Sequence, residues 1–131
     1  MDGYTQRNLR ADVDDQAKRF GLSPDLEFRV ARTDLGLERS GLSYLRIAPG
    51  FRIPFGHRHA EQEEVYVLVD GAALLRLDDE VLELRPWDAV RIAPGTVRAL
   101  EGGPDGAVLI LFGAPRTDGN DAELLQNWWA D

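Results

Sequence analysis

The sequence predicts an all-β sandwich or barrel, and two features point to that fold class. Beyond Gly71, short apolar runs alternate with turns rich in Pro, Gly and Asp, as they do in sandwiches and barrels. The run AVLILF at residues 107–112 is apolar at every position, which is typical of a strand covered on both faces. With 131 residues, the chain fits one domain that is large enough for a hydrophobic core.

The predicted elements before the barrel form an N-terminal extension, residues 1–25. Apolar residues recur at helical spacing from Val13 to Phe20, after a possible cap at Asp12, and Pro24 ends this short helix. Alternating apolar and polar side chains then predict strands at residues 26–32 and 42–48. The predicted barrel therefore begins at residue 26.

The rest of the barrel is predicted from short apolar segments bounded by turns. We expect these strands at residues 57–59, 64–69, 73–77, 81–84, 90–93, 97–101 and 107–112, so that the barrel covers residues 26–113. Residues 114–131 are expected to form a helix that packs on the barrel, because Asn120 can cap it and an apolar stripe follows. The members of this stripe are Leu124, Leu125, Trp128 and Trp129.

Composition narrows the classes of function. Fifteen basic and twenty-three acidic side chains give a formal net charge of −8, which argues against a nucleic-acid partner. The chain has no cysteine, so any metal must be held by nitrogen and oxygen. No segment resembles a signal peptide or reaches transmembrane length. We therefore expect a cytoplasmic protein without a membrane partner.

The segment that points to chemistry is GHRHAEQEEVYVLVDG, residues 56–71, which contains both histidines of the chain. His57 and His59 are two residues apart on a predicted strand, so their rings point the same way. A turn after His59 can bring Glu64 back beside them on a neighbouring strand. Two imidazoles and a carboxylate on one side of a divalent ion leave positions open for substrate or water. Gly71 falls where the returning strand must turn, a place that often needs a positive φ.

This spacing of His57, His59, Glu64 and Gly71 resembles the first motif of the cupin superfamily. Residues 85–101, RPWDAVRIAPGTVRALE, resemble the second, and the similarity covers residues 44–112. It implies a cupin double-stranded β-helix, which is a jelly-roll barrel, with a divalent metal (Fe, Mn, Ni or Zn) held by His57, His59 and Glu64. The family's fourth ligand is a histidine separated from a Pro-Gly pair by two residues, and here that position is Arg98.

Arg98 leaves two interpretations open, because arginine stays protonated and cannot ligate a metal. It could form a bidentate salt bridge with Glu64 that replaces the cation, in a metal-free sensor or storage protein. It could instead clamp the carboxylate or enolate of a metal-bound substrate, in an oxygenase or isomerase of a small molecule. A third interpretation is an interaction module with a vestigial cavity.

Further residues are expected to contact a small, anionic ligand in the cavity. Tyr66 shares the face of Glu64 by the two-residue period of a strand. Tyr44 and Arg46 share one face of the strand at residues 42–48 and are candidates as well. We also expect a homodimer, because cupins commonly associate through their sheets and the strand at residues 26–32 can add to a partner's sheet.

Overall fold

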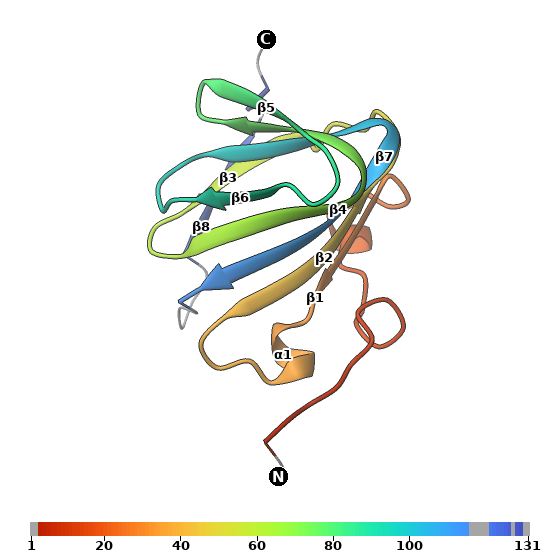
Figure 1. The fold of residues 1–131 in the computed structure, drawn as a ribbon, viewed down its shortest axis with the longest axis vertical. Coiled ribbons are helices and arrows are strands. Elements are labelled where there is room, and N and C mark those ends of the chain that lie inside the picture. The colour runs from red at the N-terminus through yellow and green to blue at the C-terminus, as the bar shows by residue number, and fades with distance from the viewer. Residues whose placement is uncertain (1–2, 116–120, 127, 130–131) are drawn as a thin grey trace.

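A computed structural model of the chain describes residues 3–115, 121–126 and 128–129. Its elements, in order, are the 3-10 helix η1 (Ala17–Phe20), β1 (Leu26–Val30), the short helix α1 (Arg32–Leu35), β2 (Gly41–Ile47), β3 (Phe55–His59), β4 (Glu63–Leu77), β5 (Glu80–Leu84), β6 (Ala89–Ile92), β7 (Arg98–Ala114) and β8 (Ala122–Gln126). The strand pairings are antiparallel, and the sheet curls back on itself (Figure 1). Within the described residues, no helix combines the length and apolarity that a membrane crossing requires.

Two long strands, β4 and β7, connect the two layers of the barrel. Residues 63–71 of β4 pair with residues 107–114 of β7, whereas residues 73–77 pair with residues 98–102. The paired segments 63–71 and 107–114 form the centre of the first layer, which β2 and then β1 extend beside β7 and which β6 extends beside β4. The paired segments 73–77 and 98–102 form the centre of the second layer, which β3 and then β8 extend beside β7 and which β5 extends beside β4. The hydrophobic core lies between these two layers.

Gly71 lies at the bend where β4 passes from one layer to the other. Its φ is +80°, and a Cβ there would lie 2.1 Å from the carbonyl oxygen of Gly106. The positive φ expected at Gly71 is confirmed, but the strand continues through the bend by shifting its register against β7. The strands predicted at residues 64–69 and 73–77 are therefore one strand, and residues 97–101 and 107–112 likewise fall almost entirely within β7.

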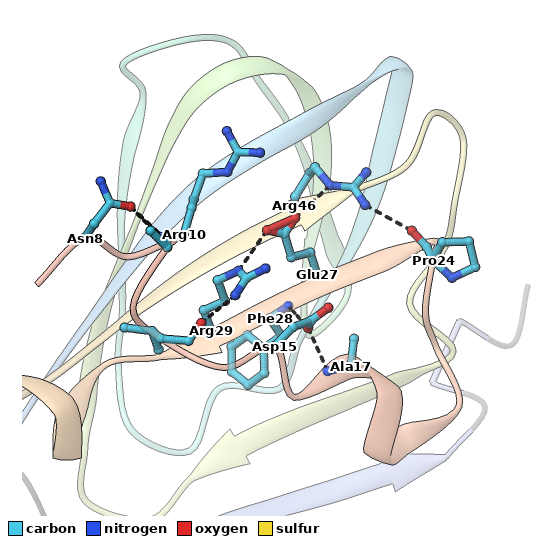
Figure 2. Close-up of polar contacts among 11 residues, drawn as sticks. Asn8, Arg10, Asp15, Ala17, Pro24, Glu27, Phe28, Arg29 and Arg46 are labelled. Carbon is cyan, nitrogen blue, oxygen red and sulfur yellow. Dashed lines mark hydrogen bonds and ion pairs between the residues drawn. The ribbon is translucent and has the colours of Figure 1, made fainter.

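The N-terminal segment, which comprises the described residues before β1 (3–25), is held against β1 and β2 by a polar network that Figure 2 shows in close-up. Glu27 accepts hydrogen bonds from Nε of Arg29 at 2.9 Å and from Nε of Arg46 at 3.2 Å. Asp15 accepts the backbone N–H of Phe28 and forms an isolated bridge with the edge of β1. Because these contacts extend the backbone around Asp15, the expected N-terminal helix is limited to η1.

The helix predicted for residues 114–131 is wrong over residues 122–126, which form strand β8. This segment pairs along the full length of β3, whose free edge would otherwise leave backbone groups unsatisfied. The expected cap at Asn120 lies outside the described residues. Trp129 does pack on the barrel: it is buried, its Nε1 donates to the carbonyl of Ile53 at 2.9 Å, and the Arg52 guanidinium lies 4.4 Å from its ring centroid.

Candidate functional site

Four of the predicted site residues converge in the interior between the two layers. His57 and His59 come from β3, Glu64 from β4 and Arg98 from β7. Nε2 of His59 lies 3.3 Å from Oε1 of Glu64, and Nε2 of His57 lies 3.7 Å from the same oxygen. β3 is hydrogen-bonded to β7 and β8 and not to β4. Glu64 therefore reaches the rings from the facing layer, and not from a neighbouring strand as the sequence suggests.

The donors of His57, His59 and Glu64 have the arrangement that a divalent ion requires. One donor atom from each residue lies within 4.8 Å of the other two. Nitrogen and oxygen ligands bind such an ion at about 2.0–2.1 Å, which places them roughly 3–3.5 Å from each other. The observed separations of 3.3 and 3.7 Å reach this range with small side-chain rotations. These three side chains therefore fit a divalent metal ion.

Asp121, which directly precedes β8, is a site residue that the sequence analysis missed. Its Oδ1 lies 2.8 Å from Nδ1 of His59, and its Oδ2 accepts the backbone N–H groups of Glu61 and Gln62 at 2.9 and 3.1 Å. A proton held on Nδ1 leaves the lone pair of Nε2 directed at Glu64, as is common for metal-binding histidines. The sequence carries no signal for this contact, because Asp121 is 62 residues from His59.

The charges of the cluster are set by these contacts. Burial alone would raise the pKa of Glu64, but its contacts with His57 and His59 and the charge of Arg98 lower it to about 2. Burial works against protonation of His59, yet Glu64 and Asp121 together raise its pKa above the ordinary 6.5. The pKa of Asp121 falls to about 2 despite burial, because His59 and two backbone N–H groups bond to it. Protonation of His59 therefore competes with metal binding at a higher pH than it would for an ordinary histidine.

Arg98 is the most deeply buried charged residue in the described part of the chain, with an exposed fraction of 1%. Its Nε, Nη1 and Nη2 atoms are buried and make no hydrogen bond with any described residue. Nη1 lies 3.7 Å from Oε1 of Glu64, which is too long for a hydrogen bond. Glu64 and Arg98 therefore form an ion pair at this distance, but not the bidentate, hydrogen-bonded salt bridge that was one of the expectations. A buried guanidinium without acceptors is costly unless a ligand supplies them.

A cavity of about 480 Å³ opens beside these groups and is lined by His57, His59, Glu64 and Arg98. Tyr66 lines it too, as expected from its strand period, and its hydroxyl lies 3.5 Å from Oε1 of Glu64. Burial raises the pKa of Tyr66 well above its ordinary value, so the phenol stays protonated. Most other lining residues are apolar, among them Phe28, Leu45, Phe55, Leu100, Leu111 and Leu124.

Tyr44 and Arg46 lie on the opposite face of β2 and do not line this cavity, which corrects the expectation drawn from the sequence. The inward side chain between them is that of Leu45. Arg46 is held by Glu27 in the network of Figure 2. Tyr44 is buried, and its pKa is raised by this burial and by the charge of Glu27. Alternation along a strand shows that two residues share a face, but it does not show which face is inward. Here the face that carries Tyr44 and Arg46 points away from the cavity and is covered by the N-terminal segment.

Comparison with solved structures identifies the architecture. A cupin protein from Bacteroides fragilis superposes with a TM-score of 0.71 over 92% of this chain and 91% of its own, at 21% sequence identity. The chain has the cupin fold. KdgF from Halomonas sp. superposes on this chain with a TM-score of 0.69, at 19% identity, over 88% of this chain and 96% of that one. No family model matches the sequence.

Two further similarities bear on the chain. The nucleoside dehydratase Pac13, a variant of which from Streptomyces was solved with uridine, superposes with a TM-score of 0.63 at 16% identity, over 79% of this chain and 80% of that one. An uncharacterized protein of Methanocaldococcus jannaschii is 30% identical over 71 residues, which is 53% of this chain and 57% of that relative's length. One fold hosts many activities, so the chemistry must be argued from the site.

Proposed function

We propose that this cupin binds a small anionic molecule in its cavity, with a divalent metal ion held by His57, His59 and Glu64, and with Arg98 in contact with the anion. The observation that carries the proposal is the convergence of three metal donors beside a buried guanidinium that finds no hydrogen-bond acceptor among the described residues. Three protein ligands leave positions on the ion open to a substrate. A fixed positive charge near the ion is unfavourable unless an anion offsets it.

The bound ion would supply Lewis-acid polarisation of a ligand oxygen. The chain's own groups do the rest: Asp121 orients His59, and Arg98 stabilises negative charge on a carboxylate or an enolate. Iron, manganese, nickel and zinc all accept imidazole and carboxylate ligands. This set of groups suits an isomerase or an oxygenase, and the enzyme Pac13 has the same fold.

The two alternatives have less support. A metal-free sensor that relies on a Glu64–Arg98 salt bridge requires a hydrogen-bonded pair, whereas Nη1 and Oε1 are 3.7 Å apart. A vestigial cavity in an interaction module is expected to be filled with apolar side chains. Here a cavity of about 480 Å³ is lined by both histidines and by Arg98.

Metal analysis tests the proposal directly. The protein is purified without chelator, stripped of metal, and titrated with Mn²⁺, Fe²⁺, Ni²⁺ and Zn²⁺ by calorimetry. We expect one ion per chain in the wild type and at least a 100-fold weaker interaction in His57→Gln. The matched control is Arg58→Gln, on the same strand but exposed and paired with Glu123. A wild-type protein that takes up none of the four ions would overturn the proposal.

The homodimer stays a prediction. β1 is an edge strand, but the N-terminal segment already occupies part of its edge, since Gln16 N–H donates to the carbonyl of Phe28 at 2.7 Å. A partner's strand would have to displace this segment. Light scattering coupled to size exclusion, on the wild type and on a variant that lacks residues 1–16, measures the mass and tests this edge.

A further inference from the structure

Most of the polar side chains that line the cavity are concentrated at one place. His57, His59, Tyr66 and Arg98 each have a polar atom within 3.7 Å of Oε1 of Glu64. The polar end of any ligand must therefore meet this cluster, because the cluster contains both the fitted metal donors and the guanidinium.

The rest of the wall is largely apolar and is supplied by many segments. The N-terminal segment, β1, β2, β7 and β8 each contribute to it, with side chains that include Leu22, Phe28, Leu45, Leu111 and Leu124. The other polar lining residues are Ser43, Gln62 and Arg32. The Gln62 amide already donates to the carbonyl of Pro115 at 3.4 Å, whereas Nε of Arg32 is buried and finds no acceptor among the described residues. This wall offers few partners for the hydroxyl groups of a ligand.

The wall therefore discriminates between classes of ligand. A hydroxyl buried without a partner weakens binding by about tenfold or more, whereas each methylene that leaves water strengthens it about three- to fourfold. The volume of about 480 Å³ is within the range of roughly 300–1,000 Å³ for small-molecule sites. It has room for an alkyl chain or an aromatic ring beside the polar cluster.

The charged end of the ligand is defined by Arg98. Its guanidinium is a planar fork of donors that matches a carboxylate with two parallel hydrogen bonds. Its three nitrogens are buried and find no acceptor in the described residues, so a carboxylate would satisfy them. Glu64 cannot take this role while its Oε1 faces the two histidines.

We infer that the cavity takes a carboxylate with a hydrophobic alkyl or aryl body, and excludes sugar acids and nucleosides. The inference rests on the proposed function for the contact between the anion and Arg98, and it adds the chemical class of the ligand. Its carboxylate lies at Arg98 and the metal donors, and its apolar body lies against the wall formed by β1, β2, β7 and β8.

A chain-length series tests this class on the wild-type protein. Butanoate, hexanoate, octanoate and phenylacetate are titrated calorimetrically into metal-free and zinc-loaded protein, beside gluconate and uridine. Affinity should rise about three- to fourfold per methylene, or about 100-fold from butanoate to octanoate. A flat series, or tighter binding of gluconate or uridine than of octanoate, would overturn the inference.

Substitution of Arg98 tests the position of the charged end. Wild type should bind octanoate at least tenfold more tightly than neutral octanamide. Arg98→Met should abolish this preference, Arg98→Lys should retain part of it, and the control Arg58→Met should leave it unchanged. A thermal melt reports whether each variant is folded. A preference for octanoate that survives in folded Arg98→Met would overturn the assignment.

The two proposals fail separately. If no metal binds but affinity still rises with chain length in the metal-free protein, the metal-dependent function is wrong and the ligand class stands. If metal binds and the series is flat, the ligand class is wrong and the metal site stands.

Discussion

Removal of the Asp121 carboxylate should weaken metal binding far more than it disturbs the barrel. The side chain of Asp121 is 14% exposed, and its Oδ1 holds Nδ1 of His59 at 2.8 Å. In Asp121→Ala the ring loses the partner that sets its orientation and its proton position. Loss of such a partner typically weakens metal binding 10- to 100-fold, which corresponds to about 1.4–2.8 kcal/mol.

Asp121→Asn should not restore the wild-type affinity. Both carboxylate oxygens of Asp121 are acceptors, because Oδ2 receives the N–H groups of Glu61 and Gln62. The amide of asparagine has one acceptor oxygen, so its NH₂ group must face either His59 Nδ1 or these two backbone donors. We expect an affinity between those of the wild type and the alanine variant.

The assay is calorimetric titration with Zn²⁺ and Mn²⁺, with a thermal melt of each metal-free variant. Glu123→Gln is the matched control. It removes a carboxylate two residues from Asp121, and among the described residues this carboxylate forms its ion pair with the exposed Arg58. The reasoning is refuted if Asp121→Ala binds both metals within twofold of wild type. It is equally refuted if Glu123→Gln loses as much affinity as Asp121→Ala.

Three further predictions follow from the titrating groups and from the bend in β4. A protonated His59 cannot ligate a metal and its pKa is raised, so metal affinity should fall as the pH drops through neutrality; calorimetry on the acidic side, in buffers of different ionisation enthalpy, should detect a proton released on binding. Glu64 has a pKa of about 2 in the folded protein against an ordinary 4.5, so it contributes roughly 3 kcal/mol of stability above pH 4.5 that is lost as the pH falls towards 2. In urea unfolding of the metal-free protein, Glu64→Gln should flatten this acid limb, and an unchanged pH profile would contradict the assignment. Gly71→Ala should cost at least about 3 kcal/mol, because its Cβ would clash with the Gly106 carbonyl, whereas Gly95→Ala has a similar φ and open space and should cost about 1 kcal/mol. Equal losses in these two variants would show that the close approach at Gly71 is unimportant.

The barrel strands and the His57, His59 and Glu64 set could be predicted because their signals are local. Alternation of side chains along a strand shows which residues share a face. Turns rich in Gly, Pro and Asp show where each apolar strand ends. The spacing of the two histidines on one strand fixes their common direction whatever the strand packs against. The structure confirms the cupin fold that this pattern implies.

Other features depended on contacts between segments that are distant in the sequence. The apolar stripe at residues 124–129 suits a helix as well as a strand, and the open edge of β3 selects the strand. The same pairing carries Asp121 to His59. Alternation leaves the inward face of β2 undecided, and the N-terminal network places Tyr44 and Arg46 outside the cavity. Arg98 is conspicuous in the sequence, but only the packing of both layers buries its guanidinium away from every acceptor in the part of the chain that the structure describes, because burial and hydrogen bonding are properties of the assembled barrel.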